Sequence, residues 1–363
     1  MSEQYPSRMD RYSKKKKHPV RNSILLLLVL LILGVGGYAF YVYSRTKQAF
    51  NFTFDAQNRA ANVNYDGKRP FSVLLMGTDT GAFGRKAVRG NSDTMIIATV
   101  NPQKKKFTLM SIPRDTMAEM QGTPRFSVHK INAAYNIGGP KMAMKTVSAV
   151  LDVPVKNYVV LNMGGLRKMV DGVGGVTVVP PLTFDYGGYH FVKGEKEHLN
   201  GKQALAYARM RYDDPQGDYG RQARQRQVII SIINHAASLK TLSNLESILG
   251  SAEKNVRTNM SFDDMTAIVK NYRSCTQNSS SDYLHGTGCM IGDASYQVMS
   301  DKELNRCSKI VRSQLGLEPV DLDNNETYQN GMNTSFNWHS TDGNQRYYVY
   351  TPNGKLWNGD NYD

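Results

Sequence analysis

Three short apolar runs rich in β-forming residues open the central part of the chain. They are FSVLLMG (71–77), TMIIATV (94–100) and KFTLMSI (106–112), each bounded by Gly, Asn or Pro. Runs of this length and composition are typical of buried β-strands. The NPQKK segment between the last two predicts a hairpin turn, so we expect those two strands to pair.

Helical periodicity follows these strands. The segment GGPKMAMKTVSAVL places Met142, Met144, Val147 and Leu151 at helical spacing. Three further stretches predict helices: GGLRKMVDGVGG, LNGKQALAYARMR and YGRQARQRQVIISIINHAASL. The runs NYVVLNM and VTVVP are typical of strands. Strands separated by helices, several of them wholly apolar, indicate an α/β fold, and we expect a three-layer α-β-α sandwich around a mostly β-sheet core.

An uncharged stretch near the N-terminus, ILLLLVLLILGVGGYAFYVY (24–43), predicts a transmembrane helix. At about 1.5 Å per residue it is long enough to cross a hydrocarbon core of roughly 30 Å. Seven Lys and Arg residues against two acidic ones precede it, and such a basic tail stays on the cytoplasmic side. We therefore predict a single-pass protein of the cell membrane, with a cytoplasmic N-terminus and an extracellular body.

A cleaved signal peptide is the alternative interpretation of this stretch. Its apolar core would be shorter, and the cleavage site that should follow is poorly matched by GYAFYVYSR. With a retained anchor, the predicted organisation is a basic tail (1–23), a transmembrane helix (24–43), a juxtamembrane connector (44–69), a catalytic domain (70–274) and a partly disordered appended region (275–363). The last boundary rests on a shift toward Ser, Asn, Gly, Asp and Tyr.

The charge of the chain limits the classes of partner that it favours, and its cysteines limit the possible disulfides. The net charge is +14, of which +5 lies before Ile24 and +9 on the remainder. A basic body favours anionic partners such as nucleic acid, anionic lipid or phosphate-bearing polymers. The three cysteines, Cys275, Cys289 and Cys307, have no metal-binding spacing. One disulfide with a free thiol and no disulfide at all are both compatible with them.

Polar side chains stand where the predicted strands end. Asp79 follows the first strand, Asp93 precedes the second, and Arg114 and Asp115 follow the third. Open α/β sheets bind ligands in the crevice at strand ends. Two carboxylates there are hard oxygen ligands suited to Mg²⁺ or Mn²⁺. Taken singly, each aspartate is better explained as a residue that ends a strand and caps a turn.

Arginines gather in the stretch that follows. Arg209 and Arg211 are two apart, so they share a side only if the chain becomes extended after Ala208. Arg221 and Gln225 are four apart and share a helix face near an N-terminus that itself favours anions. Arginine is preferred to lysine where forked donors meet phosphate oxygens. A solvated helix paired with its own aspartates is the plainer alternative.

These stretches together, in order, resemble the LytR-CpsA-Psr family of membrane-anchored glycopolymer transferases. The matching pieces are LLMGTD, NSDTMIIATVNP, SIPRDT, KINAAYNIGG, NYVVLNMGGLRKMVDGVGGV, LNGKQALAYARMR and GDYGRQARQRQ, which cover most of 71–239. The resemblance implies an extracytoplasmic phosphotransferase. Such enzymes take a glycopolymer (teichoic acid, capsule or another wall polysaccharide) from a polyprenyl-pyrophosphate carrier and attach it to peptidoglycan. The implied partners are that carrier, peptidoglycan and membrane lipid.

The resemblance also implies roles for individual residues. Asp79 and Asp93 match the Mg²⁺-associated carboxylates, and the pyrophosphate-binding set matches Arg114, Arg209, Arg211, Arg221 and Gln225. Family members often carry arginine just before the Ser-Asp dipeptide, where this sequence has Asn91. Arg85 or Arg89 is the candidate replacement. Asp115 is expected to orient Arg114 or cap a turn. A polyprenyl tail needs an apolar slot, for which the sheet face and the Met142–Met144 helix are candidates.

Other classes of function remain as alternatives. A non-catalytic module that binds wall or lipid phosphates would use the same arginines, but it gains nothing from two carboxylates that face its ligand. A pyrophosphatase would use water as the acceptor. A DNA-binding regulator is disfavoured, because the predicted cytoplasmic tail (1–23) is too short for a folded reader and no nucleic-acid partner is expected.

Overall fold

The computed structural model describes residues 44, 54–59, 63–79, 90–236 and 255–359. The predicted tail and transmembrane run (1–43) and both Arg85 and Arg89 lie outside the described residues. Among those that are described, no helix is long and apolar enough to cross a membrane. The chain divides into two compact units, 1–46 and 47–363, and the description below concerns the second.

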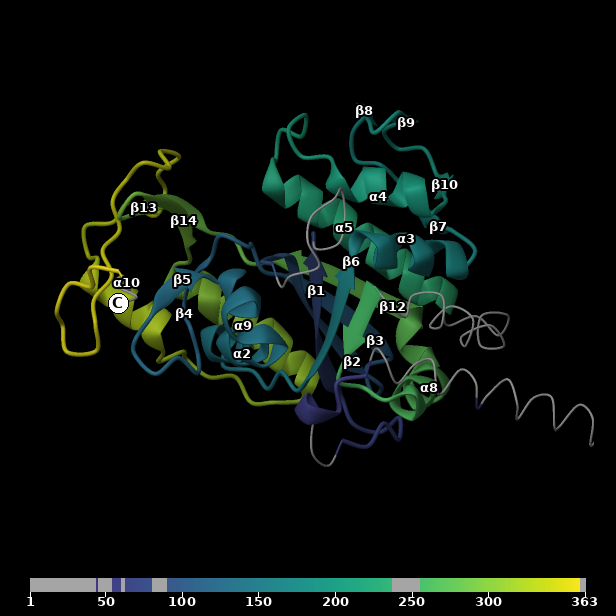
Figure 1. The fold of residues 1–363 in the computed structure, drawn as a ribbon, viewed down its shortest axis with the longest axis horizontal. Coiled ribbons are helices and arrows are strands. Elements are labelled where there is room, and N and C mark those ends of the chain that lie inside the picture. The colour runs from purple at the N-terminus through teal and green to yellow at the C-terminus, as the bar shows by residue number, and fades with distance from the viewer. Residues whose placement is uncertain (1–43, 45–53, 60–62, 80–89, 237–254, 360–363) are drawn as a thin grey trace, which may run out of the picture. The chain divides into compact units, whose positions relative to one another are not determined.

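A six-stranded mixed sheet forms the centre of this unit (Figure 1). Its strand order is β11 (Val256–Thr258), β6 (Asn157–Asn162), β1 (Phe71–Thr78), β2 (Ser92–Asn101), β3 (Lys106–Ser111) and β12 (Asn278–Tyr283). The predicted hairpin is confirmed, because β2 and β3 pair antiparallel across the 102–105 turn. β6 runs parallel to β1, and β12 runs parallel to β3.

Helices lie on both sides of the sheet, which confirms a mixed α/β fold with a central sheet. α2 (Ala133–Leu151) and α9 (Asp301–Leu315) cover one face. α3 (Met163–Gly172), α5 (Asp218–Ala236) and α8 (Phe262–Asn271) lie on the other, and α4 (Gly201–Arg209) packs on α3 and α5 (Figure 1).

Short elements complete the unit. The paired strands are β4 (Met117–Glu119) with β5 (Val128–Lys130), β7 (Val176–Val178) with β10 (Glu197–Leu199), β8 (Phe184–Tyr186) with β9 (Tyr189–Phe191), and β13 (Thr287–Ile291) with β14 (Ala294–Val298). The short helices are η1 (Ala56–Asn58), η3 (Arg273–Gln277) and α10 (Asn325–Met332).

The C-terminal region differs from the predicted division at residue 274. β12 is an edge strand of the main sheet, and α9 packs on the same sheet through Leu304, Cys307 and Val311. The prediction of an appended region was therefore wrong for 278–315, which belongs to the central fold. The error came from the Ser- and Asn-rich composition of β12, which is typical of irregular segments. The composition is polar because this edge strand is largely solvent-facing. All three cysteines are free and buried.

Candidate active site

An apolar cavity of about 750 Å³ lies between one face of the sheet and helices α3, α5 and α8. Its floor consists of alternate residues of neighbouring strands, among them Val73 and Leu75 of β1 and Ala98 and Val100 of β2. Alternation follows from the two-residue period of a strand, which turns every second side chain to the same face. The cavity therefore runs along the strands, and β1 gives it a length of roughly 23 Å from Phe71 to Thr78.

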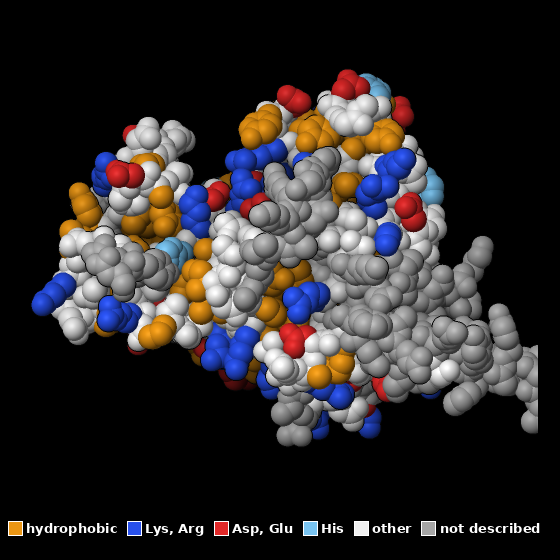
Figure 2. Space-filling model, in the orientation of Figure 1, with side chains coloured by type: hydrophobic (Ala, Val, Ile, Leu, Met, Phe, Trp, Pro, Cys, Tyr) orange, Lys and Arg blue, Asp and Glu red, His pale blue; other side chains and the backbone are white. Residues whose placement is uncertain are grey.

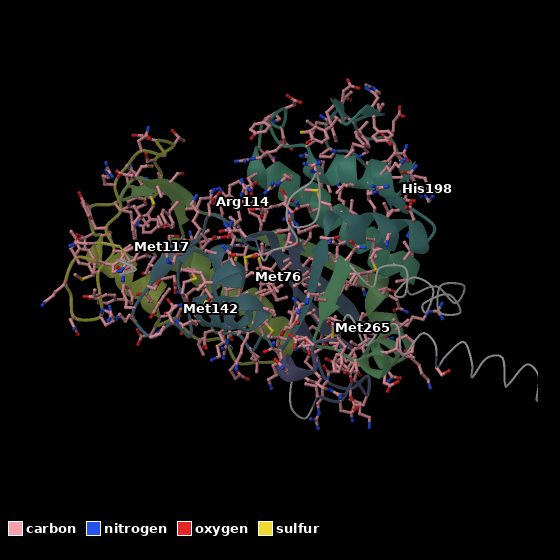
Figure 3. The ribbon with its side chains drawn as sticks, viewed as in Figure 1. Met76, Arg114, Met117, Met142, His198 and Met265 are labelled. Atoms are coloured by element: carbon pink, nitrogen blue, oxygen red, sulfur yellow. The ribbon has the colours of Figure 1, made fainter. Side chains whose placement is uncertain are left out.

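The helix expected to line this slot lies on the other side of the sheet. Met142 and Met144 of α2 are buried in the core formed with Leu74 and Met76. Figure 3 shows Met142 and Met265 on opposite sides of the strands. Met265 of α8 lines the cavity, and Met142 does not. The expectation that α2 lines the slot is thus wrong, since its methionines are ordinary core residues.

A β-bulge delivers the two aspartates to one end of the cavity. Gly77 of β1 pairs with Thr94, but Thr78 pairs with Ser92, which leaves Asp93 as the extra residue of β2. In a regular strand Asp93 and Thr94 would point to opposite faces, whereas both line the cavity here. Bulges commonly re-aim a side chain in this way. Asp79, directly after β1, lines the same end.

Arg114 joins the aspartates from the end of β3. Its guanidinium donates to Asp93 Oδ1 at 3.2 Å, and its Nε lies 3.6 Å from Asp115 Oδ2. Burial alone would lower the pKa of Arg114, but Asp93, Asp115 and Asp218 raise it above its ordinary value. The predicted orienting contact between Asp115 and Arg114 is present. Lys130 holds the other oxygen of Asp115, with Nζ 2.9 Å from Oδ1.

Arg209 and Arg211 reach the cavity because helix α4 ends between them. Arg209 is its last residue, and Met210 follows with φ −54° and ψ 135°, an extended conformation. This is the condition under which residues two apart share a side. Both arginines line the cavity, while Met210 between them is fully buried in the neighbouring core.

The next helix, α5, carries arginines that line the cavity and arginines that do not. Arg221 and Gln225 of α5 both line the cavity, as their four-residue spacing predicts. Arg226 points elsewhere and donates to Ser111 Oγ at 2.7 Å. Arg224 is fully buried and pairs with Asp214. Arg224 thus pairs with an aspartate, as the plainer alternative expected, but it is buried rather than solvated, and Asp214 precedes the helix.

Sequence reasoning did not assign Asp218 or Asn132 to the site. Asp218 Oδ1 lies 2.6 Å from Arg221 and 3.7 Å from Arg211, so it links the two arginine-bearing segments. Its position three residues before Arg221 was the available signal. Asn132 donates to Asp93 Oδ1 at 3.4 Å. It stands just before α2, ahead of the segment GGPKMAMKTVSAVL (138–151) over which the sequence predicted the helix.

Several buried polar atoms at this end have no hydrogen-bond partner among the described residues. They include Arg114 Nε, Arg221 Nε and Gln225 Oε1. Burial lowers the pKa of Arg221, and so do the neighbouring charges of Arg114 and Arg211, whereas Asp218 raises it. Clustered cations with unused donors are electrostatically incomplete, because buried polar groups are normally satisfied. An anionic head group with several oxygens would complete them.

The donor set also fits a divalent cation. Within the described part of the chain, no group of three or more His, Cys, Asp or Glu side chains is placed to hold a metal ion. Asp79 and Asp93 therefore offer two carboxylates and leave the remaining positions to other oxygens. Mg²⁺ is commonly bound in this manner, by one or two carboxylates together with phosphate oxygens and water.

An apolar cavity lined at one end by arginines and carboxylates is suited to an amphiphile with a phosphate-rich head. The chain belongs to the LytR_cpsA_psr family, whose model matches residues 38–313. It is 43% identical over 301 residues to a polyisoprenyl-teichoic acid--peptidoglycan teichoic acid transferase TagU of Enterococcus faecalis, covering 83% of this chain and 98% of the relative.

Solved structures show the same fold. A crystal structure of an E. faecalis protein described as a transcriptional regulator aligns with a TM-score of 0.66 at 36% identity, covering 77% of this chain and 100% of the other. A structure of TagT bound to LIIa-WTA aligns with a TM-score of 0.58 at 26% identity, covering 72% and 96%.

Proposed function

We propose that the protein is an extracytoplasmic phosphotransferase, anchored in the cell membrane by residues 24–43. It transfers an anionic glycopolymer from a polyprenyl-pyrophosphate carrier to peptidoglycan. Supporting the proposal are the E. faecalis relative named as a teichoic acid transferase and the TagT structure bound to LIIa-WTA. Of the candidate polymers (teichoic acid, capsule and other wall polysaccharides), teichoic acid is the one those names favour.

One observation carries this proposal. The arginines come from three separate elements, the ends of β3 and α4 and the first turns of α5, yet they meet at one end of an apolar cavity. A structural ion-pair network needs no cavity, and a pocket for a neutral lipid needs no arginines. A pyrophosphate joined to a polyprenyl chain requires both.

The site would promote transfer through position and charge. An acceptor hydroxyl oxygen of peptidoglycan attacks the phosphorus that bears the glycopolymer. The bond from that phosphorus to the bridging oxygen breaks, polyprenyl phosphate leaves, and the hydroxyl proton is released. Charge accumulates on the phosphate oxygens in such a reaction, so fixed cations supply most of the catalysis. Arg114, Arg211 and Arg221 are placed to neutralise that charge.

The proposed cofactor is Mg²⁺, with Mn²⁺ as a substitute. Asp79 and Asp93 would hold it beside the pyrophosphate, where it would neutralise oxygen charge. Arg114 competes for Asp93 Oδ1 in the present arrangement, so we expect this contact to weaken when the cation binds. The Arg114 guanidinium would then turn toward the phosphate oxygens and donate two parallel hydrogen bonds to them.

The decisive experiment uses the full-length protein in detergent with a polyprenyl-pyrophosphate-linked oligosaccharide and peptidoglycan fragments. Mass spectrometry should find the oligosaccharide phosphate on the fragment. Released oligosaccharide phosphate without transfer would indicate a pyrophosphatase, and tight carrier binding without turnover would indicate a binding module.

Chelation tests the metal assignment in the same assay. We expect EDTA to abolish transfer and Mg²⁺ to restore it. Asp93→Ala should lower transfer and weaken its response to Mg²⁺ while retaining the melting temperature, because a strand-end carboxylate contributes little to the core. Asp185→Ala, an exposed change in β8, is the matched control and should behave like the parent. Equal transfer with and without chelator in the parent protein would refute the metal.

A further inference from the structure

The cavity reaches the protein surface at the end opposite to the aspartates. Its lining there includes Phe71 at the start of β1, Val100 near the end of β2, and Arg273 and Thr276 of η3. Arg273 is exposed, so the cavity opens where this residue stands. The distance along β1 separates this opening from the arginines that face the pyrophosphate.

Cations surround this opening. Three segments at the same end of the sheet contribute them: the loop before β1, the turn between β2 and β3, and the junction of α8 with η3. We name them together the basic rim, which consists of Lys68, Arg69, Lys105, Lys106, Lys270 and Arg273. Lys104 is not part of it, because its Nζ donates to the Ser313 carbonyl oxygen of α9 on the other face of the sheet. Figure 2 shows several Lys and Arg side chains along the lower edge, beneath β2 and β3.

Hydrogen bonds hold these segments together. Gln103 of the turn donates to the Lys68 carbonyl oxygen at 2.6 Å. The hydroxyl of Tyr272, next to Arg273, donates to the Arg69 carbonyl oxygen at 2.8 Å. The three segments (66–69, 102–106 and 270–273) contain a single carboxylate, Asp66. The basic rim is therefore one continuous, strongly positive surface.

We propose that the basic rim docks on the anionic surface of the lipid bilayer, so that the open end of the cavity faces the membrane. This inference rests on the proposed function, since it gives the carrier's polyprenyl tail a direct path from the bilayer into the cavity. The pyrophosphate then lies at the far end, where wall polymers have access.

The combination of charge and apolarity favours a bilayer over a soluble polyanion. A soluble polymer would match only the cations, whereas a membrane offers anionic head groups to the rim and hydrocarbon to the opening inside it. Basic side chains near an anionic leaflet attract it over about one Debye length, which is about 8 Å at physiological salt.

The test reconstitutes the full-length protein in phosphatidylcholine vesicles, with or without phosphatidylglycerol, that contain a head-group quencher lipid. A fluorophore is attached through Gln277→Cys beside the rim or through Gln216→Cys near the arginines; both positions are exposed. The unsubstituted chain, whose cysteines are buried, is the labelling blank. Phosphatidylglycerol should increase the ratio of docked to undocked protein, read from quenching at 277, by about fivefold or more, because each rim cation near the surface contributes about that factor. Quenching of the label at 216 should change little when phosphatidylglycerol is added.

Charge reversal supplies the matched control. Lys68→Glu with Lys105→Glu should abolish the phosphatidylglycerol effect, and so should about 1 M salt, where the Debye length is about 3 Å. Lys193→Glu with Lys196→Glu, an equal charge change in the exposed loop before β10, should retain it. Equal quenching at both labels, or an effect independent of phosphatidylglycerol, would overturn the proposal.

Two further measurements complete the test. Carrier binding in detergent should be unchanged by Lys68→Glu with Lys105→Glu, because the rim lies far from the pyrophosphate site. If the parent protein binds no carrier in detergent, the proposed function is refuted, but the docking result still holds. A soluble polyanion is the alternative partner, and polyphosphate serves as its probe. The docking proposal is wrong if polyphosphate binds the parent in detergent, the variant no longer binds it, and quenching at 277 does not depend on phosphatidylglycerol.

Discussion

The two faces of the central sheet are both apolar, yet one is packed solid and the other is hollow. On the α2–α9 face, Leu74, Met76, Met95 and Ile97 are between 0% and 2% exposed. On the α5–α8 face, alternate residues of the same strands border a cavity of about 750 Å³. The faces therefore differ in what covers them, and hydrophobicity alone does not distinguish a core from a lipid slot.

Side-chain size and helix position explain the difference. The hollow face presents Val73, Ala98 and Val100, but it also presents Phe71, Leu75 and Phe107, so side-chain size contributes only in part. The packed face presents methionines and isoleucines that meet α2 directly. Protein interiors otherwise fill to the density of organic crystals, so a dry cavity of this size costs stability. Such a cavity is retained where a ligand fills it.

The largest expected effect concerns the charged end of the hollow face. Arg114→Lys retains the charge and loses the forked donor pair, so we expect transfer to fall by roughly 100- to 1000-fold. Carrier affinity should fall as well, while the melting temperature stays near that of the parent. Arg226→Lys is the control on α5. It should reduce stability through its buried bond to Ser111, but it should leave the carrier affinity of the folded protein unchanged. Equal losses of affinity would mean that the site is a diffuse basic surface.

A pair of alanines compares the faces directly. Ala143 of α2 is 0% exposed in the packed core, and Ala98 of β2 borders the cavity. Ala143→Leu should destabilise by about 1–3 kcal/mol, since overpacking forces side chains off their rotamers. Ala98→Leu has room, so it should leave the free energy of unfolding almost unchanged and weaken binding of long-chain carriers. Urea unfolding and carrier titration measure the two outcomes. Similar destabilisation by both would show that the cavity collapses in solution.

The remaining prediction concerns a buried acid on the packed side, whose effect on stability depends on pH. Glu326 of α10 accepts a hydrogen bond from the Glu119 amide at 3.3 Å, and burial raises the pKa of Glu326 to about 7. The folded protein thus binds a proton that the unfolded chain has released, from about pH 4.5 upward. Stability should fall by up to roughly 1.4 kcal/mol per pH unit between about pH 4.5 and pH 7.

Glu326→Gln checks this effect, because it keeps the acceptor oxygen and removes the charge. The variant should unfold at a higher temperature than the parent at about pH 8 and at a similar temperature at about pH 5. Burial also raises the pKa of Glu119, so a weaker dependence of the same sign should remain. Identical slopes for parent and variant would exclude Glu326 as the titrating group.

The sequence was sufficient to predict β1, β2, β3 and β6 of the main sheet, the hairpin, and the shared face of Arg221 and Gln225, since each depends on local spacing. Arg221 and Gln225 share a face because a helix has a fixed period, and no tertiary information is needed for that. The bulge at Asp93 was not predictable, because it depends on the register of β1 against β2. Both sides of β1 and β2 are apolar in sequence, so which of them is hollow depends on how the helices pack.

The edge position of β12 has a consequence for how this protein could be shortened. A chain ending at residue 274 would leave the backbone groups of β3 unpaired and uncover the core beneath α9. Long unpaired edges recruit other chains and aggregate. The backbone N–H of Gln297 in β14 donates to the Asp115 carbonyl oxygen, and its side-chain Oε1 accepts from the hydroxyl of Tyr219. Gln297 therefore links the two segments that carry Arg114 and Arg221. Removing the segment 278–298 would therefore also remove contacts that position the arginine site.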